Sequence, residues 1–152
     1  MYIKDFLDQY KDKKIKLFVD MDGVIADYII GQPKDYDKKR PLFDSINILK
    51  LISELPNVEM YILSATRKTE GIEQKHWWLD KYAPFFKKGN RIIISREANN
   101  MTETSILKAE YMRTYKRDDS IMIVIDDDPK NLTKIHELNE DIILLKDSAL
   151  ID

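Results

Sequence analysis

The sequence predicts a three-layer, Rossmann-like α/β fold, in which helices cover both faces of a five-stranded parallel sheet. Five short runs rich in Ile, Val and Leu lack the polar alternation of a half-exposed sheet, which is typical of strands buried on both faces. Helical patterns lie between these runs, so strand and helix alternate along the chain. No internal repeat, low-complexity tract or linker interrupts this order, and residues 1–152 are therefore expected to form a single domain.

The five apolar runs define the expected strands, which are residues 15–20, 58–63, 91–95, 121–125 and 141–145. Parallel neighbours need crossover connections, and the helical patterns between the runs can supply them. In sheets of this kind a ligand binds at the carboxyl ends of the strands. Functional side chains are therefore expected directly after each run.

Five helices are expected, over residues 2–12, 45–55, 70–82, 105–116 and 129–138. The second has apolar residues at the i, i+3, i+4 and i+7 positions of one face, namely Ile48, Leu51, Ile52 and Leu55. Asp44 or Ser45 is its expected N-cap, and Pro56 ends it. Asp128 and Pro129 form an N-cap and N1 pair that begins the last helix.

The composition excludes several classes of protein. A formal net charge of −2, from 25 Lys and Arg against 27 Asp and Glu, gives by itself no case for nucleic-acid binding. The absence of Cys excludes a disulfide scaffold, a thiolate zinc site and a Cys nucleophile, and the two His residues exclude a multi-His metal site. The sequence has no glycine-rich phosphate loop, no apolar run of about 18 residues and no signal peptide. We therefore expect a cytoplasmic protein with no membrane partner.

Acidic residues follow two of the expected strands. Asp20 and Asp22 end the first strand, just before Gly23, and Asp126 and Asp127 end the fourth. Such carboxylates are unfavourable at the end of a buried strand unless a cation lies beside them, and they meet if the two strands are neighbours. Hard oxygen ligands in this number suit Mg²⁺, which also binds substrate phosphate. The alternative for the first pair is a turn with a helix cap.

Ser64 and Lys108 are candidates for binding a phosphoryl group. Ser64 follows the second strand, where its hydroxyl can donate to a phosphoryl oxygen or cap a helix. Lys108 lies in the first turn of its helix and shares a face with Tyr111, Met112 and Tyr115. An inward lysine needs an anion, although its stem can also lie on apolar surface. Arg96, just after the third strand, is the rival cation.

These residues resemble the four motifs of the haloacid dehalogenase (HAD) superfamily, in the order Asp20-x-Asp22-Gly23-Val24, Ser64, Lys108 and Asp126-Asp127. The resemblance covers nearly the whole chain and implies the HAD fold. The segments 63–65, 73–82, 91–94 and 125–127 are similar to the 5'(3')-deoxyribonucleotidase-like group. That group commonly has Arg where this chain has Asp128 and a substantial cap where this chain has the loop 28–41. We therefore expect a minimal cap.

The resemblance implies a Mg²⁺-dependent phosphatase that hydrolyses a phosphomonoester, with Asp20 and Asp22 as the catalytic residues. Asp20 is then the nucleophile that forms an aspartyl-phosphate. Asp22 is the general acid and base, its pKa raised by the like charge nearby. Ser64 and Lys108 are implied to bind the phosphoryl oxygens. The implied metal ligands are Asp20, the backbone carbonyl of Asp22, Asp126 and Asp127.

The expected substrate is a nucleotide or a nucleic-acid end, as in a 5'(3')-nucleotidase or a polynucleotide 3'-phosphatase, because a site without a cap admits large phosphoesters. The candidate rim cations are Lys34, Lys38, Lys39, Arg40, Arg67 and Lys68. Another subunit that covers the site is the alternative to an open one. Other functions considered are hydrolysis of another small phosphometabolite and a catalytically silent binding protein, which Asp22 argues against. The order of the motifs argues against a receiver-type signalling module, in which the acidic and lysine motifs come in the reverse order.

Overall fold

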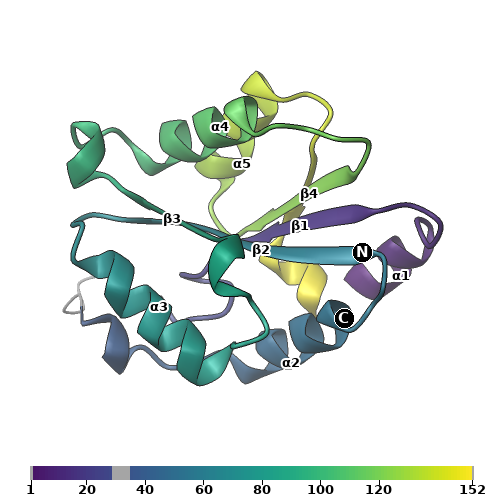
Figure 1. Cartoon of the computed structure of the whole chain (residues 1–152), viewed down its shortest axis with the longest axis horizontal. Helices are drawn as coiled ribbons and strands as arrows, with labels where there is room; N and C mark the ends of the chain where they lie inside the picture. Colours follow the sequence, from purple (N-terminus) through teal and green to yellow (C-terminus); the bar gives the residue numbers. More distant parts are fainter. Residues whose placement is uncertain (1, 29–34, 152) are drawn as a thin grey trace.

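The chain forms a five-stranded parallel sheet with the order β3-β2-β1-β4-β5 in a computed structural model that describes residues 2–28 and 35–151 (Figure 1). The strands are β1 (Ile15–Val19), β2 (Val58–Thr66), β3 (Arg91–Ser95), β4 (Ile121–Asp126) and β5 (Ile143–Lys146). The predicted fold class is confirmed. The central strand β1 lies between β2 and β4, so the first acidic pair follows the middle of the sheet.

Two strands, β2 and β5, differ from the predicted bounds by more than one residue at one end, whereas β1 and β4 each end one residue from the prediction. β2 continues to Thr66 because residues 64–66 remain paired with β3. β5 begins at Ile143, and Asp141 lies before it with its carboxylate on the guanidinium of Arg117. In both cases backbone pairing sets the end of the strand. The prediction instead places the strand by its apolar residues, which do not show where pairing begins or ends.

Helices form a layer on each face of the sheet. The helices are α1 (Ile3–Asp8), α2 (Phe43–Ser53), α3 (Gly71–Tyr82), α4 (Thr104–Thr114) and α5 (Pro129–Leu138). Figure 1 shows α1, α2 and α3 on one face and α4 and α5 on the other. Four short 3-10 helices, η1 to η4, cover Tyr36–Lys38, Lys88–Asn90, Glu97–Asn99 and Asp147–Leu150. The three predicted layers are thus present.

Each face of the sheet has its own core, as strands without polar alternation require. Leu17 and Val19 point to the core beneath α1 to α3, which also contains Trp78. Phe18, between them in sequence, belongs to the second core, with Met112 of α4. Alternate side chains of a strand point to opposite faces, so β1 buries apolar side chains on both, and its one charged residue, Lys16, pairs with Asp118. This burial fixes the end of β1 in the middle of the molecule.

Of the two predicted helix N-caps, the cap of α5 is confirmed and the cap of α2 is wrong. The Asp128 carboxylate accepts a hydrogen bond from the backbone nitrogen of Lys130 at 2.9 Å, so Asp128 is the predicted N-cap. Neither Asp44 nor Ser45 caps α2, because the helix begins earlier, at Phe43. Asp44 lies in the first turn, where a carboxylate is still favourable to the helix dipole.

The described part of the loop 28–41 packs on α3. Its short helix η1 places the Tyr36 ring edge-on to Trp78, with ring centroids 5.8 Å apart. The indole nitrogen of Trp78 donates to the backbone oxygen of Lys39 at 3.0 Å. Among the described residues, no helix combines the length and the hydropathy that a membrane span needs. The loop therefore lies beside the carboxyl ends of the strands, fixed by aromatic packing.

Candidate active site

The two acidic motifs meet because β1 and β4 are direct neighbours. Val19 is in register with Ile125, and the backbone nitrogen of Asp20 donates to the Ile125 oxygen at 3.0 Å. Asp20, Asp126 and Asp127 each offer a carboxylate oxygen, and these atoms all lie within 4.8 Å of one another. Three of the four expected carboxylates therefore converge at the carboxyl end of the sheet, and the carboxylate of Asp22 is not among them.

Gly23 makes room for this cluster. It has a φ of 81°, in the left-handed region that favours glycine. A Cβ atom at this position would lie 2.0 Å from Oδ2 of Asp127. The turn after Asp22 therefore requires glycine both for its backbone conformation and for its close approach to the acidic cluster.

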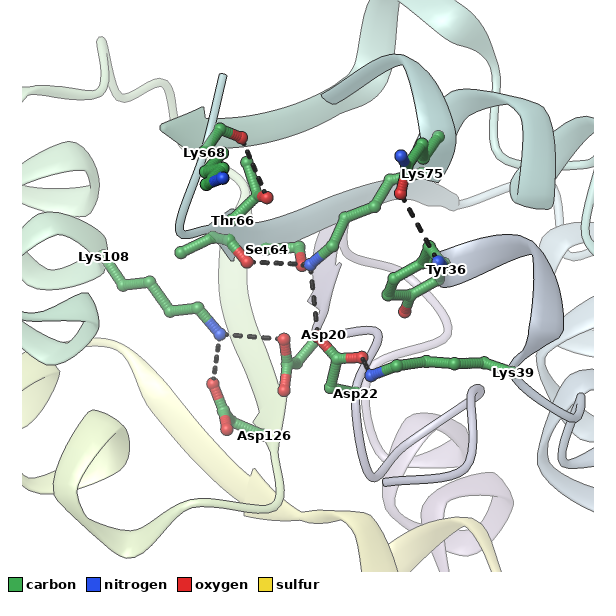
Figure 2. Close-up of polar contacts among 12 residues, drawn as sticks. Asp20, Asp22, Tyr36, Lys39, Ser64, Thr66, Lys68, Lys75, Lys108 and Asp126 are labelled. Atoms are coloured by element: carbon green, nitrogen blue, oxygen red, sulfur yellow. Dashed lines mark hydrogen bonds and ion pairs between the residues drawn. The ribbon is translucent and has the colours of Figure 1, made fainter. Parts of the chain in front are cut away.

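Lys108 supplies the cation between two of these carboxylates (Figure 2). Its Nζ atom lies 2.9 Å from Oδ1 of Asp20 and 2.7 Å from Oδ2 of Asp126, and its side chain is 1% exposed. It lies in the second turn of α4, not the first, because the helix begins at Thr104. Burial lowers the pKa of Lys108, but Asp20 and Asp126 outweigh this and hold that pKa above its usual range.

The carboxylates of the cluster remain crowded despite Lys108. Burial raises the pKa of Asp20 well above its ordinary value, and the Lys108 ammonium offsets only part of this. Burial and the neighbouring Asp126 also raise the pKa of Asp127. Three carboxylates around one ammonium leave negative charge uncompensated. Their oxygens are the hard donors that Mg²⁺ prefers, so the residues present fit a divalent cation.

A second buried lysine, Lys75 of α3, is a site residue that the sequence analysis missed. Its Nζ atom lies 2.6 Å from Oγ of Ser64, 2.7 Å from the backbone oxygen of Ala65 and 3.1 Å from Oδ2 of Asp22 (Figure 2). A signal was present. Lys75 precedes Trp78 and two other apolar residues at i+3, i+4 and i+7, the same inward pattern that identifies Lys108.

Asp22 lies between Lys75 and Lys39, whose Nζ atom is 2.5 Å from Oδ1. Burial by itself would raise the pKa of Asp22, but the two ammonium groups outweigh it and lower the pKa to about 2. The expectation that a like charge raises this pKa is therefore wrong for the protein without substrate. The physical reason is that both lysines contact Asp22 in the fold, although they lie 53 and 17 residues from it in the sequence.

The remaining candidates divide between the site and its surroundings. Ser64 is buried and hydrogen-bonded to Lys75. Arg96 donates from Nε and Nη2 to the backbone oxygens of Thr102 and Met101, at 2.9 and 3.0 Å, so among the described residues Lys108 rather than Arg96 contacts Asp20.

A groove of about 1140 Å³ leads away from Asp22 and Lys75. Five of the six candidate rim cations line it, namely Lys38, Lys39, Arg40, Arg67 and Lys68. The sixth, Lys34, lies outside the described residues. The aromatic rings of Tyr28 and Tyr36 also line the groove, and Lys39 lies over both rings. The groove is basic and partly aromatic, and the site opens into it.

Comparison with solved structures finds the same fold in three groups of proteins. A chain of the Pnkp1/Rnl/Hen1 RNA repair complex aligns with a TM-score of 0.68 and 16% identity over 89% of this chain. The HAD domain of the effector protein Lem4 from Legionella pneumophila gives 0.55 and 18% over 88%, covering 84% of that domain. D,D-heptose 1,7-bisphosphate phosphatase from B. bronchiseptica, complexed with magnesium and phosphate, gives 0.56 and 13% over 90%, covering 95% of its chain.

These similarities concern structure rather than sequence. This chain spans 42% of the RNA repair protein that it matches, so it corresponds to less than half of that protein. No protein-family model matches the sequence, and no curated protein matches it. Three observations point to the same fold: the strand order, the neighbouring acidic motifs and the HAD domains among the similar structures. The chain therefore has the fold of the haloacid dehalogenase superfamily, as the resemblance of its four motifs predicts.

Proposed function

We propose that this protein is a Mg²⁺-dependent phosphatase that hydrolyses a phosphomonoester through an aspartyl-phosphate at Asp20. The observation that carries the proposal is the position of Asp20 at the end of β1. Its carboxylate lies in a cluster with Asp126 and Asp127, and Lys108 holds one of its oxygens. A carboxylate that is positioned in this way can attack phosphorus with its other oxygen.

The chemistry balances with the residues present. Asp20 attacks phosphorus, the ester bond breaks, and Asp22 gives a proton to the departing oxygen. Water then attacks the phosphorus of the aspartyl-phosphate, Asp22 takes its proton, and Asp20 is released with inorganic phosphate. Asp22 must be protonated for the first step, whereas two lysines hold its pKa at about 2 without substrate. An anionic phosphoryl group beside Lys75 adds negative charge near Asp22 and raises this pKa.

A bound Mg²⁺ ion would be held by Asp20, the backbone oxygen of Asp22, Asp126 and Asp127. The positive charge it supplies offsets the repulsion between the Asp20 carboxylate and an anionic substrate. Ser64 and Lys108 are the proposed donors to the phosphoryl oxygens, and the contact of Lys75 with Ser64 supports Lys75 as a third. All three side chains are buried, where such donors stabilise developing charge more strongly than in water.

The proposed substrate is a nucleotide or a nucleic-acid end. The basic groove beside Asp22 supports this class, because phosphates pair with cations and a base can stack on the exposed ring of Tyr28. The match to a chain of an RNA repair complex also supports it. The match to a heptose bisphosphate phosphatase favours the second candidate, another small phosphometabolite.

The test of the activity uses p-nitrophenyl phosphate. We expect hydrolysis with Mg²⁺, none with EDTA, and a loss of at least about 10⁴-fold in kcat for Asp20→Asn, since the nucleophile is removed. Near-normal Mg²⁺-dependent turnover by Asp20→Asn would contradict the assignment. A panel of nucleotides, 3'-phosphorylated oligonucleotides and sugar phosphates then ranks the two substrate classes by kcat/KM.

A further inference from the structure

The cations that line the groove divide into two banks with different charge balance. The first bank is the loop segment 35–40, and the second is formed by Arg67, Lys68 and Arg96 at the ends of β2 and β3. Figure 2 shows Lys39 of the first bank and Lys68 of the second on opposite sides of Lys75. A substrate that leaves the site through the groove therefore meets one bank or the other.

Each cation of the loop bank already has a carboxylate partner. Lys38 pairs with Asp35 at 3.3 Å and Arg40 pairs with Asp27 at 3.0 Å. Lys39 pairs with Asp22 at 2.5 Å. These pairs neutralise the bank, so it offers little net attraction to another anion.

The second bank is not neutralised. Within residues 2–28 and 35–151, no carboxylate forms an ion pair with Arg67, Lys68 or Arg96. Glu70 is the one acidic residue of this bank that lines the groove. The Glu97 carboxylate also lies beside the bank, where it accepts from the backbone nitrogen of Thr69 at 3.5 Å. Three cations against these two carboxylates leave the bank with a net positive charge, directly beyond Ser64 and Ala65 of the site.

The second bank is also held in place by its backbone. The nitrogen of Arg96 donates to the oxygen of Thr66 at 2.8 Å, and the nitrogen of Glu97 donates to the oxygen of Arg67 at 3.0 Å. The guanidinium of Arg96 is fixed by the two carbonyls described above. Asn100 and Met101 reach positive φ values of 55° and 54° in that loop, a conformation that Asn adopts readily and Met rarely. In this conformation the carbonyls of Met101 and Thr102 face the Arg96 guanidinium.

We propose that Arg67, Lys68 and Arg96 form a subsite for a second phosphate of the substrate, separate from the phosphate that is hydrolysed. The inference rests on the proposed function for the position of the reactive phosphate. The groove volume, about 1140 Å³, exceeds the roughly 300–1000 Å³ that encloses one small ligand. The shared chemistry is a phosphate group, which either the next phosphodiester of an oligonucleotide or the second phosphate of a nucleoside bisphosphate can supply.

The test compares the wild type with Arg67→Ala/Lys68→Ala, since both side chains are exposed and their loss leaves the core intact. Lys50→Ala/Lys116→Ala, which removes two exposed cations elsewhere, is the matched control. The substrates are p-nitrophenyl phosphate, a nucleoside 3'-monophosphate, a nucleoside 3',5'-bisphosphate and a 3'-phosphorylated trinucleotide. We expect KM for the trinucleotide to rise about tenfold. The kcat of the variant and its kcat/KM on the two monophosphates stay within about two-fold of wild type.

The two larger substrates identify the source of the phosphate. A rise in KM for the trinucleotide alone assigns the subsite to a phosphodiester, and a rise for both assigns it to any second phosphate. An unchanged KM for both overturns the proposal. An equal loss on monophosphates and trinucleotide also overturns it, because the two cations then act on the reactive phosphate.

A binding measurement keeps this test separate from the proposed activity. Fluorescence anisotropy with a labelled 3'-phosphorylated trinucleotide, in an Asp20→Asn background, needs no turnover. Loss of the two cations should weaken binding about tenfold and reduce the slope of log K against log salt by about 1.4. If wild type hydrolyses none of the substrates, the proposed function fails, and the anisotropy still decides the subsite. Equal affinity of the double variant and its Asp20→Asn parent overturns it.

Discussion

Lys108 and Lys75 reach the site from opposite faces of the sheet, and they differ in what holds them. Lys108 lies between two carboxylates, which raise its pKa. Lys75 contacts one carboxylate, a hydroxyl and a backbone carbonyl, and burial lowers its pKa. The difference indicates that Lys108 is part of what stabilises the acidic cluster. Lys75, with mostly neutral partners, is better suited to bind an incoming anion.

Lys108→Met should have the largest effect on stability. It leaves Asp20 and Asp126 buried without their cation, which we expect to lower the free energy of unfolding by about 3–5 kcal/mol in the absence of metal. Urea denaturation with EDTA measures this loss. Lys134→Met, which breaks an exposed pair with Glu137, should cost less than about 1 kcal/mol. Equal losses for the two variants would remove the structural role of Lys108.

Lys75→Met should affect activity more than stability. Asp22 keeps Lys39 as a partner, so the free energy of unfolding should fall by about 1–3 kcal/mol, the cost of the lost hydrogen bonds. We expect kcat/KM on p-nitrophenyl phosphate to fall about a hundredfold, because a donor to the phosphoryl group is lost. Steady-state kinetics at saturating Mg²⁺ measure this. Activity close to wild type would place Lys75 in a structural role only.

Lys39→Ala tests the ion pair on the groove side of Asp22. The folded-state pKa of Asp22 is about 2, below the value of about 4 expected when unfolded. A depressed carboxyl pKa contributes stability above about pH 4 and loses it as the pH falls toward 2. The variant should therefore lose about 1 kcal/mol at neutral pH. The difference from wild type should shrink between about pH 4 and 2, measured by urea denaturation across pH. A difference that is constant with pH would contradict the pairing.

Asp128→Ala should have the smallest effect and separates the helix cap from the acidic cluster. Removal of the N-cap hydrogen bond to Lys130 should cost about 1 kcal/mol of stability. Turnover should remain within about two-fold of wild type, because the side chain caps α5 and Asp126 and Asp127 remain. Thermal unfolding and the phosphatase assay measure the two effects. A large loss of Mg²⁺-dependent turnover would instead place Asp128 among the metal ligands.

The sequence carries much of the fold because the central strands are largely apolar on both faces. β1, in which Lys16 is the one charged residue, and β4 are visible as apolar runs, and acidic residues are visible at their ends. Lys108 is identifiable because its helical neighbours at i+3, i+4 and i+7 are large and apolar or aromatic. The register of β1 with β4, which brings the acidic ends together, is a tertiary property that no local pattern contains.

The missed features have the same physical origin. Lys75 follows the helical rule as clearly as Lys108, but its partners Ser64 and Asp22 lie in other elements, so no local sequence feature shows the anion that it needs. Lys39 reaches Asp22 because tertiary contacts, among them the hydrogen bond from Trp78 to the Lys39 oxygen, hold the loop against α3. The low pKa of Asp22 depends on both contacts, so the sequence predicts a shift of this pKa in the wrong direction.

The central claim is that Asp20 becomes phosphorylated during turnover. The direct measurement quenches the reaction rapidly and treats the protein with borohydride, which reduces an aspartyl-phosphate to homoserine. Mass spectrometry of the peptide that contains position 20 then detects the homoserine. The account predicts homoserine at position 20 in the presence of substrate and Mg²⁺, and none with EDTA or in Asp20→Asn. Turnover without homoserine at position 20, or with homoserine at another aspartate, would contradict it.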